Sequence, residues 1–182
     1  MQKRRLGRSD LFVTPLCLGT MTYGEQTGRD EAFAILNRAV GFGVDFLDAA
    51  EMYPVPPKRE TQGATETIIG DWLAARGRRN DIVLATKVCG RSANDWFRDD
   101  GSPTRLTRTQ IFEAVEKSLR RLRTDHIDLY QIHWPDRAVS DWGTVPSRFK
   151  PFVPAADETA IEETAAVFAE LVAAGKIRHF GL

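Results

Sequence analysis

Short, nearly continuous apolar segments alternate along the chain with longer segments in which apolar residues recur at helical spacing. The apolar segments predict strands at 16–20, 45–50, 82–87 and 127–133, and a last run at 177–182 begins a fifth strand. The segments between them predict helices near 30–43, 65–77, 106–124 and 158–176. Strict alternation of this kind is typical of parallel strands joined by right-handed crossovers and covered by helices.

The apolar positions of each expected helix define the face that it should bury. We expect the following side chains to point inward: Phe33, Leu36 and Val40; Ile68, Ile69, Trp72 and Leu73; Ile111, Phe112, Val115, Leu119 and Leu122; Ile161, Ala165, Phe168 and Val172. Thr107 and Gln110 form a capping-box pattern at the start of the third helix. Ahead of these units, two short alternating segments in residues 2–14 predict a small N-terminal β-hairpin.

The connections between these elements distinguish a (β/α)₈ barrel from a doubly wound sheet, since the alternation alone fits both. The long connections, 88–106 and 134–156, both follow strands, whereas the returns from helix to strand are only a few residues long. A barrel builds its site from the loops at the carboxyl ends of its strands. The sequence has no low-complexity tract or linker, so we expect residues 1–182 to form a single domain.

Composition narrows the class of protein without identifying it. Of the 182 residues, 42% are hydrophobic and 27% are charged, which excludes disordered, collagenous and disulfide-rich classes. Basic and acidic residues number 25 each, so the summed charge favours neither nucleic acid nor an anionic membrane, and small neutral molecules are the expected partners. No segment approaches the length of a membrane span. Cys17 and Cys89 lie in apolar runs, where we expect buried, reduced thiols in a cytoplasmic protein.

Polar side chains stand where the predicted strands end. Asp48 ends the second strand, Lys87 the third and His133 the fourth, while Tyr53 lies in the loop after the second. Because the carboxyl ends of parallel strands meet at one mouth of a barrel, these four side chains are expected to converge. Each also has an ordinary structural explanation as a loop cap, a surface amine, a core imidazole or a packed ring. Because the four residues occur on consecutive elements, a shared functional role is favoured over four separate structural ones.

Together the four residue types suit the protonation of an oxygen atom. A phenol with its usual pKa of about 10 is a weak acid at neutral pH, so an ammonium group close to Tyr53 is expected to lower the pKa of its hydroxyl. Asp48 would keep Lys87 charged and in place, and His133 would donate a hydrogen bond that orients a substrate oxygen. This is the proton half of a carbonyl reduction.

Motifs for other chemistry are absent from the sequence, including GxSxG, HExxH, GxxxxGK[ST], CxxC, and GxGxxG between a strand and a helix. Its three histidines lie in different elements, so no protein-built metal site is expected. A lyase that uses Lys87 as a Schiff-base amine is an alternative, although Asp48 would disfavour the free amine. Aromatic residues of the long loops suit an apolar carbonyl substrate and equally suit loop packing: Trp96, Phe97, Trp142, Phe149 and Phe152.

The chain resembles the amino-terminal half of an aldo-keto reductase, in the Tas-like and potassium-channel β-subunit-like branch of that family. The stretches that carry the resemblance are LGTMTYGEQ, DFLDAAEMYPVPP, GATETIIGDWL, LATKV, SLRRLRTDHIDLYQIHWPD and GKIRHFGL. The resemblance implies a (β/α)₈ barrel that binds NADPH across its mouth and reduces aldehydes or ketones to alcohols without a metal. In that family Asp48, Tyr53, Lys87 and His133 match the catalytic tetrad.

Further positions follow from the same resemblance. Those that match the nicotinamide end of the NADP(H) site are Gly19, Thr20, Met21, Gln26 and Asp48, and Trp134 matches the substrate pocket. Since eight βα units need about 250 residues, the chain should hold about four and a half units, with most of the cofactor site in later segments. Unpaired outer strands would favour self-association. The alternative to an active reductase is a catalytically inactive truncated chain or an interaction subunit.

Overall fold

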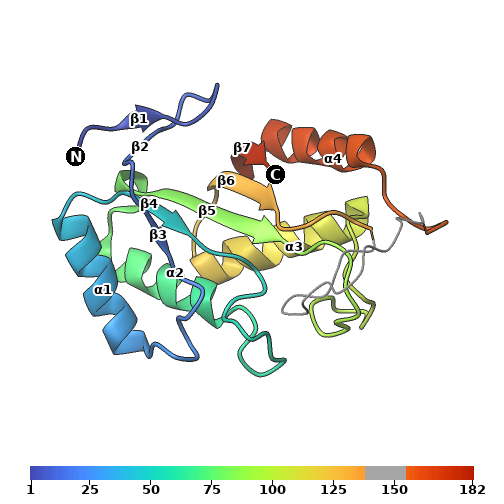
Figure 1. The fold of residues 1–182 in the computed structure, drawn as a ribbon, viewed down its shortest axis with the longest axis horizontal. Coiled ribbons are helices and arrows are strands. Elements are labelled where there is room, and N and C mark those ends of the chain that lie inside the picture. The colour runs from blue at the N-terminus through green and yellow to red at the C-terminus, as the bar shows by residue number, and fades with distance from the viewer. Residues whose placement is uncertain (138–154) are drawn as a thin grey trace, which may run out of the picture.

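The structure is a computed structural model, and it describes residues 1–137 and 155–182. In that part of the chain, five parallel strands form one sheet in the order β3-β4-β5-β6-β7 (Figure 1). The strands are β3 (Cys17–Gly19), β4 (Phe46–Asp48), β5 (Val83–Val88), β6 (Ile127–Ile132) and β7 (Ile177–Gly181). The spatial order equals the chain order, as in a barrel, whereas a doubly wound sheet reverses at a switch point.

Helices connect successive strands of this sheet. They are α1 (Arg29–Gly41), α2 (Ala64–Arg76), α3 (Arg108–Leu122) and α4 (Ile161–Ala173), and a short 3-10 helix, η1 (Arg79–Asp81), precedes β5. In Figure 1, α1, α2 and α3 lie along one side of the sheet, and α4 packs on both α3 and β7. The predicted fold, about four and a half units of a (β/α)₈ barrel, is therefore confirmed. Across the described residues, no helix is long and apolar enough to cross a membrane.

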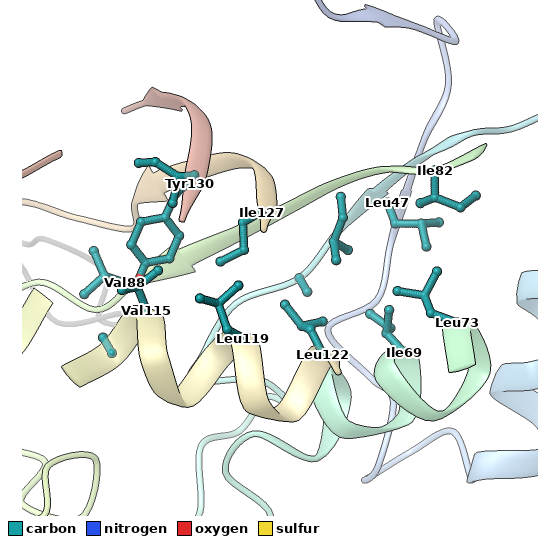
Figure 2. Packing of buried hydrophobic residues seen from close by; sticks show 14 of the residues in the cluster. Leu47, Ile69, Leu73, Ile82, Val88, Val115, Leu119, Leu122, Ile127 and Tyr130 are labelled. Atoms are coloured by element: carbon teal, nitrogen blue, oxygen red, sulfur yellow. The ribbon is translucent and has the colours of Figure 1, made fainter. Parts of the chain in front are cut away.

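The core lies between the sheet and helices α2 and α3 (Figure 2). Strand residues such as Leu47 and Ile127 meet helix residues such as Ile69 and Leu122, and all four are completely buried. The predicted inward faces of α2 and α3 are thus confirmed in outline. Burial of such side chains stabilises each by about 1.5–3 kcal/mol relative to leaving it in water.

The predicted inward face of α4 is wrong at two positions. Ile161 and Val172 are exposed, at 46% and 39%, although Phe168 is buried as expected. The buried side of the helix includes Thr164, whose hydroxyl donates to the Ala160 carbonyl at 3.2 Å. Because this hydrogen bond satisfies its polar atom, a threonine can occupy the interior, and the buried face is rotated from the one that apolar residues alone indicate.

The N-terminal hairpin forms as predicted, with β1 (Arg4–Arg5) antiparallel to β2 (Phe12–Val13). Its turn contacts the last strand of the described sheet, since the Asp10 carboxylate lies 2.6 Å from His179 Nε2 on β7. Its end contacts the second strand, since the Thr14 amide donates to Asp45 Oδ1 at 2.9 Å, just before β4. The hairpin therefore joins elements that are far apart in the sequence.

Two local predictions hold only in part. Thr107 accepts the Gln110 amide at 3.4 Å as an N-cap, but the Gln110 side chain accepts the Arg105 amide at 2.6 Å and does not complete the capping box. Cys89 is buried as expected, whereas Cys17 is exposed. Cys17 lies on β3, which pairs only with β4 in the described sheet, so one side of this strand has no neighbour to cover it.

Candidate active site

The ends of β4, β5 and β6 bring the predicted polar side chains to one edge of the sheet. Lys87 Nζ donates to Asp48 Oδ2 at 2.6 Å and to the Ala49 carbonyl at 2.7 Å. It also lies 5.0 Å from the centre of the Tyr53 ring. That ring meets the His133 imidazole edge-on, with centroids 5.6 Å apart. The side chains of Asp48, Tyr53, Lys87 and His133 are all partly buried.

The loop that carries Tyr53 is held at both ends by backbone hydrogen bonds. Its start is fixed because the Tyr53 amide donates to the Ala50 carbonyl at 3.0 Å. Its end returns to the same residue, since the Gly63 amide donates to the Tyr53 carbonyl at 3.0 Å. Gly63 has a φ of 79° and would place a Cβ 2.5 Å from the Arg121 side chain, so glycine is required at this position.

The Tyr53 hydroxyl is protonated over the physiological range. Burial first, and then the neighbouring Asp48 and Cys89, raise the pKa of Tyr53 to about 12. The prediction that Lys87 lowers this pKa is therefore wrong for the structure described here. The main reason is burial of the phenol, to which the nearby Asp48 carboxylate adds, so the protonated form is favoured although Lys87 lies 5.0 Å from the centre of the ring.

His133 is neutral at pH 7. Burial and then the positive charge of Lys87 lower the pKa of its imidazole from 6.5 to about 4. Its Nδ1 is buried and has no hydrogen-bond partner among the described residues. A neutral imidazole in this position can donate one hydrogen bond to a substrate oxygen.

Trp134 lies beside His133 at the end of β6. Its ring is tilted against the imidazole with centroids 4.9 Å apart, and its Nε1 donates to the Arg91 carbonyl at 2.8 Å. Both side chains line a cavity of about 810 Å³ whose apolar wall includes Leu106 and Ile132. The tryptophan is thus fixed in orientation next to the candidate site, as a substrate-pocket residue would be.

Two of the residues expected at the nicotinamide end of a cofactor, Gly19 and Thr20, lie beside Asp48. Gly19 has free space next to it, whereas Thr20 makes a structural hydrogen bond. Gly19 pairs in register with Asp48, and a Cβ on it would meet no atom within 4 Å. Thr20 is buried and donates to the Asp48 carbonyl at 2.7 Å. The sheet edge beside Asp48 is therefore open at Gly19, where a flat ring could approach the backbone.

Met21 and Gln26, which lie in the connection between β3 and α1, form hydrogen bonds to the loop that carries Tyr53. The Met21 carbonyl accepts the Val55 amide at 2.9 Å, and Gln26 Nε2 donates to the Val55 carbonyl at 2.8 Å. The Met21 side chain is 52% exposed. Only the backbone of Met21 is engaged in this contact, so its side chain faces solvent near the site.

The aromatic loop residues are described only in part. Phe97 is fully buried, and Trp96 stacks on it with centroids 5.7 Å apart, so this pair packs the loop after β5. Trp142, Phe149 and Phe152 lie outside the described residues. Within the described ranges, no group of three or more His, Cys, Asp and Glu side chains is arranged to hold a metal ion.

Sequence reasoning missed a buried ion pair directly behind the site. Glu51 and Arg98 have side chains that are 1% and 0% exposed and 2.9 Å apart. A signal exists in the sequence, because Glu51 stands between an apolar strand end and Tyr53, where a solvated carboxylate is not expected. Its partner lies in a distant loop, and no spacing rule connects the two.

Five parallel strands in chain order, joined by helices, form part of a (β/α)₈ barrel. Comparison with known proteins gives the family. The chain belongs to the aldo/keto reductase family, whose family model matches residues 15–182. Protein tas of Escherichia coli (strain K12) is 45% identical over all of this chain and 51% of its own length. A probable voltage-gated potassium channel subunit beta of Arabidopsis thaliana is 36% identical over 75% of this chain and 38% of its own length.

Solved structures agree with this assignment. An aldo-keto reductase from Bacillus halodurans in its holo form matches all of this chain and 49% of its own chain, with a TM-score of 0.71 and 36% identity. The chain thus spans about half the length of the curated relatives and solved structures that it matches. The family and the solved structure are both named for reductases.

Proposed function

We propose that this chain provides the proton-delivering site of an NADPH-dependent reductase that converts aldehydes or ketones to alcohols. The observation that carries the proposal is the convergence of Tyr53 with Lys87 and His133, 5.0 Å and 5.6 Å from its ring, with Asp48 bound to the lysine. Family membership supports the reaction class, and the holo form of a similar structure supports a bound cofactor.

Each side chain has a role that follows from its protonation state. The Tyr53 hydroxyl, with its pKa raised to about 12, keeps its proton until the substrate oxygen becomes an alkoxide, which is the stronger base. His133, neutral at pH 7, donates a hydrogen bond that points the carbonyl oxygen toward Tyr53. Asp48 holds Lys87 beneath the phenol, where the ammonium supports the negative charge that Tyr53 acquires as it gives up its proton.

The residues present fit one part of the cofactor, its nicotinamide end. The open sheet edge at Gly19, next to Asp48, would hold the nicotinamide end, with Thr20, Met21 and Gln26 around it. What NADPH supplies there when bound is the hydride for the carbonyl carbon. The apolar cavity beside His133 and Trp134 suits an apolar or aromatic carbonyl substrate.

The proposal extends to the location of the protein and to the domain that contains the site. We propose a cytoplasmic protein in which residues 1–182 act as part of one barrel domain. A closed barrel has eight strands, so the edges of β3 and β7 would pair with strands of a further segment or of a second copy. Either arrangement would complete the mouth of the barrel around Tyr53.

The test is NADPH oxidation by the purified protein at its full encoded length, with para-nitrobenzaldehyde as substrate. Replacing Tyr53 with Phe removes the proton donor, so kcat should fall by roughly 10²-fold or more. Tyr130→Phe is the control, because it likewise removes one phenol hydroxyl, and it should keep turnover. The Tyr130 hydroxyl is buried without a hydrogen-bond partner among the described residues. Full turnover by Tyr53→Phe would refute the assigned role. Failure of wild type to bind NADPH would favour the non-catalytic alternative.

A further inference from the structure

We propose that the buried Glu51–Arg98 pair is a positioning device that sets Tyr53 and Lys87 relative to each other. The inference rests on the proposed function, since its consequence is the rate of proton delivery from Tyr53. Neither partner is exposed to solvent, so neither side chain is a catalytic group. Both act through the segments that they join.

The pair has the geometry of a fixed contact. Arg98 donates from two guanidinium nitrogens to the two carboxylate oxygens of Glu51, at 2.9 Å and 3.0 Å. Two parallel hydrogen bonds fix both the distance and the relative orientation of the two side chains. Complete burial removes competing water, so the arrangement is held more tightly than a surface pair would be.

Glu51 joins the two segments that carry the site. It stands two residues before Tyr53, and its Oε1 accepts the amide of Cys89, which is two residues after Lys87, at 2.7 Å. Its own amide donates to the Lys87 carbonyl at 3.1 Å. The tyrosine segment is therefore fastened to the end of β5 at two points, the Lys87 carbonyl and the Cys89 amide.

Gln62 and Arg98 extend this connection to two loops. Gln62 Nε2 donates to the Glu51 carbonyl at 2.5 Å, near the end of the Tyr53 loop. Arg98 belongs to the long connection between β5 and α3. Loss of the arginine would allow the Glu51 carboxylate to rotate. The loop that follows Glu51, which determines where the Tyr53 hydroxyl points, would then be held less firmly.

Electrostatics argue for positioning rather than for stability alone. Burial would raise the pKa of Glu51, but the charge and hydrogen bonds of Arg98 and the Cys89 amide hold it below its usual value, so the carboxylate stays ionised. Buried ion pairs commonly stabilise a fold no better than apolar residues of the same volume. What the pair provides in addition is a single orientation for the segments at the site.

The chain contains a matched control at the opposite end of the same strands. Asp128 is buried, accepts the Leu84 amide of β5 at 3.0 Å and pairs with Arg79 at 2.8 Å. It thus combines a buried carboxylate, a backbone amide of β5 and an arginine, as Glu51 does. In the described structure, none of the hydrogen bonds of Arg79 reaches the Tyr53 loop.

The experiment compares Arg98→Met with Arg79→Met in the protein at its full encoded length. Hydrogen–deuterium exchange of the peptide covering residues 49–63 is measured without cofactor, and steady-state kinetics are measured below the melting temperatures of all variants. Arg98→Met should exchange faster in this peptide and lose roughly tenfold or more in kcat, with KM changed less than about twofold. Arg79→Met should lower Tm while leaving that peptide and kcat near wild type.

Two further variants keep the comparison decisive. Glu51→Gln combined with Arg98→Met avoids an unpaired buried charge, and it should show the same loss of kcat if the single variant does not fold. Arg98→Lys keeps the charge without the second hydrogen bond and should recover part of the rate. Equal effects of Arg98→Met and Arg79→Met, or unchanged exchange in residues 49–63, would overturn the inference. Absence of turnover in wild type would instead refute the proposed function, and the exchange comparison would still decide whether the pair holds this loop.

Discussion

Lys87 Nζ lies 2.6 Å from Asp48 Oδ2, across the boundary between neighbouring strands β5 and β4. The lysine side chain is 12% exposed and the aspartate 28%, so the contact is only partly screened by water. Because the same ammonium also donates to the Ala49 carbonyl at 2.7 Å, two acceptors fix its position below the Tyr53 ring. The two residues therefore form one unit rather than two independent groups.

Replacement of either partner should lower activity, and replacement of both should lower it little further. Lys87→Met removes the charge that supports Tyr53, and Asp48→Asn releases the lysine from its position, so each should reduce kcat/KM by roughly 10²- to 10⁴-fold. In the double variant the losses should be far from additive, as for groups that act together. A kinetic double-mutant cycle measures this, and fully additive losses would show that the two side chains act separately.

The stability of the protein should depend on pH through His133. Its folded-state pKa is about 4 and its unfolded value 6.5, so the unfolded state binds more protons between these limits. The stabilising contribution is complete above pH 6.5 and is lost as pH falls through 4, with a total of about 3 kcal/mol at most. Urea unfolding should therefore show that the difference in unfolding free energy between wild type and His133→Gln shrinks as the pH is lowered from 6.5 to 4. Parallel pH profiles would contradict the buried, neutral imidazole.

The strand order and the convergence of the candidate site residues are predictable from sequence for the same reason. Alternation of apolar strands with amphipathic helices implies parallel neighbours, and parallel neighbours deliver their last residues to one edge. Asp48 ends β4, Lys87 is the last but one residue of β5 and His133 directly follows β6, so the order of elements is enough to bring them together. The position of Tyr53 follows less directly, because it depends on how its loop returns to Gly63.

Features that depend on satisfied polar groups are not predictable in this way. Thr164 and Glu51 are buried because each has its partners, Thr164 within its own helix and Glu51 in a distant loop. Hydrophobic patterning assigns both to the surface, and this misplaces the inner face of α4 and conceals the ion pair behind the site. The pKa of Tyr53 is likewise not predictable from the pattern, since it depends first on burial of the phenol and then on the neighbouring Asp48 and Cys89.

Asp136 should contribute strongly to stability. Its side chain is 0% exposed, and it receives Arg105 Nε at 2.7 Å and the amides of Leu106 and Thr159 at 3.2 Å each. Asp136→Ala leaves these donors unpaired and should cost about 3–5 kcal/mol in unfolding free energy. Asp157, which is 63% exposed and pairs with Arg105 as well, is the matched comparison.

Asp157→Ala should cost at most about 1 kcal/mol, because its ion pairs are exposed to solvent. Urea unfolding of the two alanine variants separates the contributions of the buried and the exposed carboxylate within one network. Similar costs for the two variants would mean that Asp136 is not enclosed as described.

Gly90 fixes the approach of the loop after β5 to the end of β6. A Cβ at this position would lie 1.9 Å from the Trp134 carbonyl oxygen and 2.7 Å from that of Pro135, both backbone atoms. Gly90→Ala therefore has to displace the segment that follows His133, and overpacking of this kind costs about 1–3 kcal/mol. Because Trp134 and His133 would move with the backbone, turnover should fall more than stability alone accounts for.

Gly41→Ala provides the control for Gly90→Ala. Gly41 ends α1, and a Cβ there meets no atom within 4 Å, so alanine should be neutral or stabilise the helix by about 0.5–1 kcal/mol. Thermal unfolding and NADPH oxidation, measured on both variants, distinguish a local clash from a general effect of alanine. If Gly90→Ala matches Gly41→Ala in both measurements, the two loops do not approach each other as closely as the structure shows, and the orientation of His133 must be fixed by other contacts.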